Sequence, residues 1–242
     1  MANSYFISDA HLGMSDSISE ELKEKNLLSF FDHVAKTGER LFIVGDLFDF
    51  WFEYRTVIPR GYTRILSGLS RLNEAGIELH YIAGNHDFWM RDYFPAELGI
   101  PIHFDDLEYT INGKRFFIEH GDGIAKEDSG YRLLKRIFRN RFNIFLYSLL
   151  HPDVGVPLAK WVSSLSRGHT SKKGQTADSD YIERARKKFQ EGFDFVLFGH
   201  LHYPIFKEMD GNVYLNLGDW IEHFTYAVFD GEELRLEKWK DK

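Results

Sequence analysis

Five short polar motifs, each placed directly after a short apolar run, constrain the fold of this chain more than any other feature. The motifs are Asp9-Ala10-His11, Gly45-Asp46-Leu47-Phe48-Asp49, Gly84-Asn85-His86-Asp87, His120-Gly121-Asp122 and Gly199-His200-Leu201-His202. The apolar runs before them have the length and composition of buried β-strands. Side chains that suit divalent metals therefore stand at strand ends spread over most of the chain. A fold that gathers these strand ends would build a two-metal site.

The residue types in these motifs match the ligands of such a centre. Asp9 and His11 are two residues apart and can reach one ion, whereas His200 and His202 can serve different ions of a pair. Asp46 follows a glycine, which permits a tight turn, and one carboxylate can bridge two cations. The chain has no cysteine, so any metal must have N and O ligands. Each motif alone arises often by chance, and a single histidine is more often structural than metal-binding, but the five together argue against coincidence.

The remaining pattern predicts α/β layers. Helical patterns with apolar faces at 27–34 and 65–72 alternate with the early strand-like runs, and Gly38 and Gly76 are the expected helix stops. Later β-rich runs at 195–198, 213–217 and 226–229 have short connections. This order favours a mixed sheet or two packed sheets. The length of 242 residues is compatible with one large domain or with a domain that carries an insertion.

Residues 124–168 interrupt this rhythm and are expected to form a helical cap inserted within a single domain spanning 1–242. An apolar stripe at helical spacing predicts a first helix that ends at His151-Pro152-Asp153, and a second helix is expected around Leu158 and Leu165. The stripe consists of Leu134, Phe138, Phe142, Phe145 and Leu149. Two interpretations stay open: the stripe packs on the core, as in most amphipathic helices, or it shelters apolar ligand at a membrane surface.

Charge is distributed unevenly. The segment from Lys126 to Lys173 contains ten Lys and Arg against three Asp and Glu, although the whole chain has a net charge of −7. A basic segment in an acidic protein indicates contact with an anionic ligand, lipid or nucleic acid, or else a solvated helical face. Nucleic acid is disfavoured because no duplex-sized basic face is evident. We find no signal peptide or stretch long enough to cross a bilayer, and we therefore expect a cytoplasmic protein.

In identity and order the five motifs resemble those of the calcineurin-like metallophosphoesterase superfamily, over nearly the whole chain. The segments Gly45–Trp51, Asp128–Tyr131 and Leu217–Trp220 further resemble the UDP-2,3-diacylglucosamine hydrolases of lipid A biosynthesis. The resemblance implies a four-layer α-β-β-α metallophosphoesterase sandwich with a helical cap insertion. It also implies that a metal-bound hydroxide attacks the α-phosphorus of UDP-2,3-diacylglucosamine, which yields UMP and 2,3-diacylglucosamine 1-phosphate.

The resemblance assigns roles to individual residues. Two divalent ions, Mn²⁺ in this family, would be held by Asp9, His11 and His202 for the first ion, by Asp46 as the bridge, and by Asn85, His120 and His200 for the second. His86 and Asp87 are the expected catalytic residues: His86 would stabilise charge on the phosphate or protonate the leaving oxygen, and Asp87 would orient its neighbours. The expected substrate contacts are Asn85, His86, Asp128, Ser171, Lys172, Lys173 and His200.

One departure concerns the substrate. Several of the lipid A enzymes carry arginine where this chain has His86; arginine is a permanent phosphate clamp, whereas histidine titrates. A hydrolase of another nucleotide or phosphodiester, and a non-catalytic scaffold on the same fold, are the alternative hypotheses. The expected partners are the lipid-nucleotide substrate and the inner face of the inner membrane, which the protein would contact peripherally. No nucleic acid and no obligate protein partner are expected.

Overall fold

The computed structural model describes residues 3–14, 19–126, 129–159 and 178–240. The helices are α1 (Glu20–Thr37), α2 (Thr63–Glu74), α3 (Tyr93–Glu97), α4 (Ser129–Phe138), α5 (Arg141–Ser148) and α7 (Asp178–Gln190), and residues 152–159 are also helical. The strands are β1 (Asn3–Ile7), β2 (Gly38–Val44), β3 (Glu78–Ile82), β4 (Ile102–His103), β5 (Leu107–Ile111), β6 (Lys114–Glu119), β7 (Phe195–Phe198), β8 (Pro204–Met209), β9 (Asn212–Leu217), β10 (Thr225–Phe229) and β11 (Leu234–Lys238).

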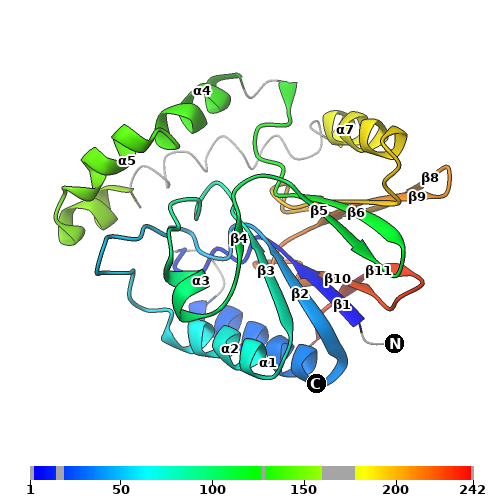
Figure 1. The fold of residues 1–242 in the computed structure, drawn as a ribbon, viewed down its shortest axis with the longest axis horizontal. Coiled ribbons are helices and arrows are strands. Elements are labelled where there is room, and N and C mark those ends of the chain that lie inside the picture. Colours follow the sequence, from blue (N-terminus) through cyan, green and yellow to red (C-terminus); the bar gives the residue numbers. More distant parts are fainter. Residues whose placement is uncertain (1–2, 15–18, 127–128, 160–177, 241–242) are drawn as a thin grey trace.

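Two sheets pack face to face between layers of helices (Figure 1). The first has the strand order β11-β10-β1-β2-β3-β4 and the second the order β5-β6-β7-β9-β8. Strands β1 to β4 run parallel, as do β6, β7 and β9, and hairpin partners complete both sheets. Helices α1 and α2 cover the outer face of the first sheet, and α7 covers the second (Figure 1). The predicted four-layer α-β-β-α sandwich is confirmed.

Alternation along the strands explains the layers. In β1, the side chains of Tyr5 and Ile7 join the core under α1 and α2, whereas Phe6 between them joins the core between the two sheets. Successive strand residues point to opposite faces, so a strand that is buried on both faces has a continuous apolar run. A third core, around Tyr181 and Phe198, lies under α7. Each motif-bearing strand is thereby held rigidly from both sides.

The apolar runs all form strands, and α1 ends where Gly38 follows it. The sequence reasoning missed four short or peripheral strands and α7, which buries only Tyr181 and Ala185. The expected single helix over the stripe is wrong. It divides into α4 and α5 because the Asn140 side chain accepts hydrogen bonds from the backbone N–H groups of Phe142 (2.9 Å) and Asn143 (3.3 Å), which starts a new helix.

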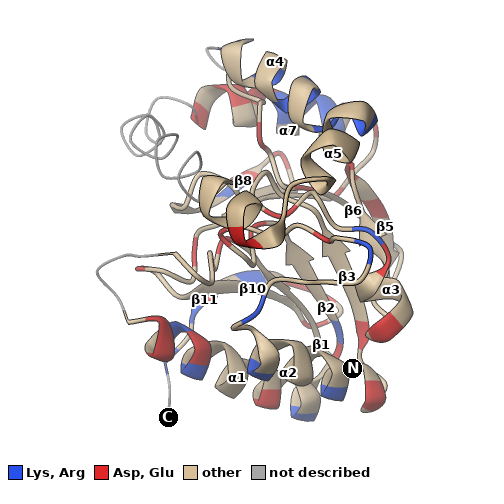
Figure 2. Cartoon of the chain, turned by 90° about the vertical axis from the view of Figure 1, so that its left-hand side faces the viewer, with Lys and Arg blue, Asp and Glu red and all other residues tan. Residues whose placement is uncertain are grey.

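Helices α4 and α5 lie outside the layers that cover the sheets (Figure 1), and basic segments run along α4 (Figure 2). Of the predicted stripe, Leu134, Phe142, Phe145 and Leu149 are 40–67% exposed, so they do not pack on the core. The part of the expected cap at 160–168 falls outside the described residues, and its bounds within one domain stay a prediction. None of the described helices is long and apolar enough to cross a bilayer.

Candidate metal centre

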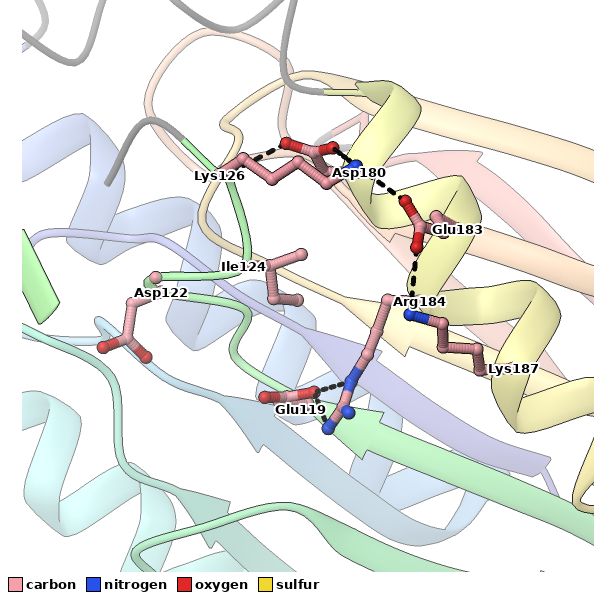
Figure 3. A pocket seen from close by; sticks show the side chains of 9 residues that line it. Glu119, Asp122, Ile124, Lys126, Asp180, Glu183, Arg184 and Lys187 are labelled. Carbon is pink, nitrogen blue, oxygen red and sulfur yellow. Dashed lines mark hydrogen bonds and ion pairs between the residues drawn. The ribbon is translucent and has the colours of Figure 1, made fainter. Parts of the chain in front are cut away.

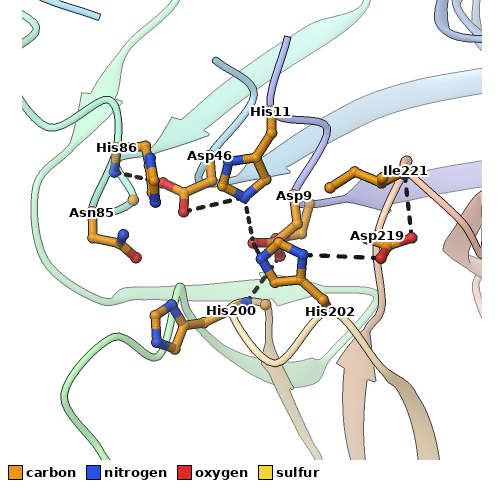
Figure 4. Close-up of polar contacts among 12 residues, drawn as sticks. Asp9, His11, Asp46, Asn85, His86, His200, His202, Asp219 and Ile221 are labelled. Carbon is orange, nitrogen blue, oxygen red and sulfur yellow. Dashed lines mark hydrogen bonds and ion pairs between the residues drawn. The ribbon is translucent and has the colours of Figure 1, made fainter. Parts of the chain in front are cut away.

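The five motifs converge at one edge of the two sheets (Figure 4). Asp9, Asp46 and Asn85 follow β1, β2 and β3 of the first sheet, and His120 and His200 follow β6 and β7 of the second. Parallel strands present their carboxyl ends at the same edge of a sheet, which is where α/β proteins bind ligands. The face-to-face packing of the two sheets brings these two edges together.

Backbone strain is concentrated at the same place. Asp9, His11, Asp46, His200 and His202 have φ angles of 55°, 45°, 52°, 68° and 57°. These are five of the eight non-glycine residues with positive φ in the described part of the chain. Such a conformation costs about 1–3 kcal/mol per residue and persists only when its surroundings impose it. Its concentration at the expected ligands indicates a functional site.

Glycines give the ligands the space they occupy. A Cβ atom on Gly84 would lie 2.1 Å from Asp46 Oδ1, and one on Gly45 would lie 2.3 Å from His120 Nδ1. A Cβ on Gly199 would lie 2.8 Å from Asp9 Oδ2. The motif glycines are therefore required for close approach between loops, besides the tight turn expected at Gly45, where φ is 80°.

In the first group of candidate ligands, buried atoms of Asp9 and His11 lack hydrogen-bond partners within the described residues. His11 Nε2 lies 3.6 Å from Asp9 Oδ1 and 3.6 Å from Asp46 Oδ2, and His202 Nε2 lies 3.4 Å from Asp9 Oδ1. Asp9 Oδ1 and both ring nitrogens of His11 have no hydrogen-bond partner within the described residues. Buried polar atoms are rarely left without a partner. A cation among them would satisfy these atoms, and the N and O donors suit a divalent metal.

The second group shares Asp46 with the first. Its Oδ2 atom lies 3.2 Å from His120 Nε2, and Asn85 Oδ1 lies 3.1 Å from the same nitrogen. His200 completes a group with Asp46 and His120. The other oxygen, Asp46 Oδ1, accepts the backbone N–H of His86 at 2.8 Å. One oxygen of Asp46 therefore faces both groups, which is the geometry of a bridging ligand.

Electrostatics reflect a compact set of opposite charges. Burial by itself raises the pKa of Asp9, but His202, His11 and His120 offset it and the pKa is lowered to about 2. Burial lowers the pKa of His120, but Asp46 and Asp9 outweigh it and raise the pKa to about 10. Without a cation, imidazolium groups thus balance the carboxylates. A bound metal would take their place and release their protons.

His86 and Asp87 occupy different positions in the third motif. The His86 ring lies at the site beside His11, with ring centroids 4.7 Å apart, and its Nδ1 is 2.9 Å from the carbonyl of Asp49, to which it donates. Asp87 is completely buried and accepts hydrogen bonds from Gly84 N (2.8 Å), Leu47 N (3.0 Å) and the Tyr81 hydroxyl. Through these hydrogen bonds Asp87 connects the loop after β3 to the loop after β2. Its assignment as a catalytic residue stays a prediction.

The sequence reasoning gave no role to Asp219, which supports the centre. Its Oδ1 accepts the backbone N–H groups of Ile221 (3.2 Å), Glu222 (2.9 Å) and His223 (2.9 Å), and its Oδ2 lies 3.9 Å from His202 Nδ1. A carboxylate behind a metal-binding imidazole orients the ring. The signal was present in the sequence, because Asp219 also follows a strand end and a glycine.

Contacts of α4 with the fourth motif place the cap beside the centre. Asp122 Oδ2 accepts the Tyr131 hydroxyl at 2.7 Å and pairs with Lys135 Nζ at 2.6 Å, and the rings of Tyr131 and His200 are 6.5 Å apart. Arg132 donates to the backbone carbonyl of Ala125 at 2.8 Å. Lys135 and Arg132 thus contact the protein itself, and contact of the cap with lipid head groups stays a prediction.

A charged pocket of about 320 Å³ lies between α7 and the loop after β6 (Figure 3). Arg184 pairs with Glu119 at 3.2 Å, and Lys126 pairs with Glu183 at 2.8 Å. None of the predicted site residues lines it. Four acidic and three basic side chains line the pocket, and none of them belongs to the metal-ligand groups.

Four predicted substrate contacts, Asp128, Ser171, Lys172 and Lys173, fall outside the described residues. The other three, Asn85, His86 and His200, lie at the centre (Figure 4). Two further histidines have partners in the structure. His80 is buried against His103 with a ring-nitrogen distance of 3.2 Å, and His223 Nδ1 lies 3.3 Å from Asp219 Oδ1.

Comparisons with known proteins agree with this fold and site. The calcineurin-like phosphoesterase profile matches residues 3–204, and the chain therefore belongs to the calcineurin-like phosphoesterase family. It is a metal-dependent hydrolase. A UDP-2,3-diacylglucosamine hydrolase of Porphyromonas gingivalis is 34% identical over 98% of this chain and 97% of that protein. The enzyme of the same name from Haemophilus influenzae is 29% identical over 93% of both.

Among solved structures, a novel archaeal phosphodiesterase superposes with a TM-score of 0.50 at 16% identity. The match covers 97% of this chain and 98% of that chain. At this identity the likeness concerns the fold alone, and it extends across both sheets.

Proposed function

We propose that this protein hydrolyses the pyrophosphate bond of UDP-2,3-diacylglucosamine to UMP and 2,3-diacylglucosamine 1-phosphate. The observation that carries the proposal is similarity over nearly the whole length to hydrolases named for that substrate. The alternative, hydrolysis of another nucleotide or phosphodiester, needs only the metal centre. The exposed apolar face of the cap favours the lipid nucleotide, because a water-soluble substrate gives such a surface no purpose.

The residues at the centre fit two divalent ions, for which we propose Mn²⁺. Asp9, His11, His202 and Asp46 would hold one ion, and Asp46, Asn85, His120 and His200 the other. Two such ions supply an activated water and neutralise charge on the phosphoryl oxygens. Asp9 Oδ1 and the two ring nitrogens of His11 support this assignment, since they are buried and have no hydrogen-bond partner within the described residues.

His86 is proposed to act on the phosphate itself. Its Nδ1 donates to the Asp49 carbonyl, which fixes the orientation of the ring at the centre. A protonated Nε2 would donate to a phosphoryl oxygen or give its proton to the leaving oxygen. Asn85 and His200, next to it, would contact the same phosphate. Asp87 would keep the loop in place through its backbone hydrogen bonds.

The cap is proposed to meet the acyl chains and the membrane surface. Large apolar side chains with 37–67% exposure cover this part of the chain. They are Leu133, Leu134, Ile137, Phe142, Phe145, Leu146, Leu149, Leu150, Val154 and Leu158. An amphipathic helix with basic residues binds at the interface of an anionic bilayer. We therefore place the enzyme peripherally at the inner face of the membrane.

The decisive experiment compares two substrates with the purified, Mn²⁺-loaded protein. UMP release from UDP-2,3-diacylglucosamine in mixed micelles is expected to exceed cleavage of bis-p-nitrophenyl phosphate by several orders of magnitude in kcat/KM. Cleavage of the simple diester with no attack on the lipid nucleotide would support the other phosphoesterase hypothesis. No metal binding and no cleavage of either compound would support a non-catalytic scaffold.

The membrane proposal has a separate test. Sedimentation with vesicles that contain anionic lipid should carry the wild-type protein into the pellet. The double substitution F142D/F145D should leave it in the supernatant, because both side chains are more than half exposed and their loss does not disturb a core. Equal sedimentation of the two proteins would rule out the cap as the contact surface.

A further inference from the structure

A buried lysine lies behind the first group of metal ligands. Lys23, near the start of α1, has no exposed surface. Its Nζ donates to the backbone carbonyl of His11 at 3.1 Å and forms an ion pair with Glu20 Oε2 at 3.1 Å. Lysine is almost never fully buried unless it is paired, and a positive charge near a helix N-terminus opposes the helix dipole. The pair with Glu20 lies within the first turns of α1, whereas the bond to His11 reaches a loop outside it, so the stability of α1 alone does not explain this residue.

The loop that Lys23 contacts is strained. His11 has a φ angle of 45°, a conformation that needs support from its surroundings. Its N–H donates to the carbonyl of Asp46 at 2.9 Å, and its own carbonyl accepts from Lys23 Nζ and from the N–H of Met14 at 3.1 Å. Glu20 adds a second hydrogen bond between α1 and this loop, because its Oε1 accepts the N–H of Gly13 at 2.6 Å. The start of α1 thus holds the loop on both sides of Leu12.

We propose that Lys23 is a positioning residue for the first metal ion. By binding the carbonyl of His11 it maintains the backbone conformation that keeps His11 Nε2 3.6 Å from both Asp9 Oδ1 and Asp46 Oδ2. The inference rests on the proposed two-metal centre. It predicts a selective effect, because Asn85 and His120 follow other strands, and His200 meets the loop after β1 through Asp9 Oδ2 and not through His11.

The test is an equilibrium titration with Mn²⁺ alone, in which electron paramagnetic resonance measures unbound metal. Lys23→Met removes the donor while keeping the length of the side chain. One of two Mn²⁺ sites should weaken by about 10- to 100-fold, the usual loss when a group that orients a ligand is removed, while the other keeps its affinity. Lys23→Gln, which retains a donor, should lie between the wild type and Lys23→Met.

Leu27→Ala is the matched control. Leu27 is one turn further along α1, is also fully buried, and packs in the core under the first sheet. This variant weakens the helix without removing the contact to His11, so it should bind Mn²⁺ as the wild type does. Equal weakening by Leu27→Ala would overturn the proposal, since helix stability would then account for the effect.

If Lys23→Met binds Mn²⁺ at both sites with wild-type affinity, the proposal that Lys23 positions the first metal ion is likewise overturned. If circular dichroism finds Lys23→Met unfolded, Lys23→Gln takes its place, and unchanged affinity at both sites in that variant refutes the proposal. A wild-type protein that binds fewer than two Mn²⁺ ions would count against the proposed metal centre, and not against the tie between Lys23 and His11.

Discussion

At the scale of single residues, Asp46 connects the two groups of candidate metal ligands. One of its oxygens faces His11 and His120, while the other accepts the backbone N–H of His86. Its pKa is held well below the usual range, because His120, His86 and His11 outweigh the effect of burial.

Asp46→Ala should therefore abolish hydrolysis while the fold persists. We expect a loss of at least about 1,000-fold in kcat, because both ions lose a ligand and electrostatic stabilisation of this kind contributes about 2.7–4 kcal/mol per group. Asp32→Ala, an exposed change on α1, is the control and should keep full activity. Turnover by Asp46→Ala within tenfold of the wild type would contradict the bridging role.

Gly84 in the third motif is required because Asp46 lies too close to leave room for a side chain. Gly84→Ala would place a methyl group 2.1 Å from Asp46 Oδ1 and 2.7 Å from the Asp46 backbone nitrogen. Because backbone is involved, the loops must separate, and we expect a loss of about 1–3 kcal/mol in the free energy of unfolding together with weaker Mn²⁺ binding. Chemical denaturation and metal titration measure the two effects. Gly130→Ala, where no atom lies within 4 Å, should show neither.

At the scale of elements, the cap is attached by aromatic contacts as well as by Asp122. On α5, the Tyr147 ring stacks on Trp89 at 5.6 Å and meets Phe52 at 4.6 Å. Trp89 lies two residues after the motif that contains His86, Phe52 lies three residues after the motif that contains Asp49, and they pair with each other as an isolated bridge. The loops that build the centre thus also hold the cap.

Tyr147→Ala should impair hydrolysis of the lipid nucleotide more than cleavage of a simple diester. It removes the stacking from the cap side and leaves the metal ligands in place, so cleavage of bis-p-nitrophenyl phosphate should stay within about twofold of the wild type. Hydrolysis of the lipid nucleotide should fall at least about fivefold, since each of the two aromatic pairs contributes about 0.5–1.5 kcal/mol beyond its buried area. Equal losses on both substrates would mean that the contact supports the centre itself.

At the scale of the whole molecule, proton binding and metal binding compete. Asp46 and Asp9 raise the pKa of His120 to about 10, above the unfolded value of 6.5. A raised pKa stabilises the metal-free fold fully below about pH 6.5, and this contribution is lost as the pH rises toward 10. Metal affinity instead increases as the pH rises, because a metal binds the neutral imidazole.

The increase in Tm on addition of Mn²⁺ should therefore grow between about pH 6 and pH 8.5. For each proton displaced, metal affinity rises about tenfold per pH unit below the pKa. Differential scanning fluorimetry at fixed Mn²⁺ measures the shift, and Asp46→Ala should show little at any pH. A shift that stays constant or shrinks with rising pH would contradict the proton–metal competition.

The architecture follows from the sequence to a large extent. The strand that precedes each motif was predicted because burial on both faces leaves a continuous apolar run, as in β1 and β2. The edge strands β4 and β8 and the helix α7 were not predicted, since half-exposed elements have a weak pattern of apolar residues. The break at Asn140 was missed because a capping asparagine competes with an apolar stripe that continues on both sides.

The sequence alone determined the types of the candidate ligands and their places at strand ends, because motif order and strand-like runs are local properties. Only the tertiary structure decided which atoms meet: the packing of two sheets brings Asp46 between His11 and His120, and it places Lys23 and Asp219 behind their ligands. It also decided that Arg132 and Lys135 contact the protein. These pairings join residues far apart in the chain, and no local pattern encodes the distance between them.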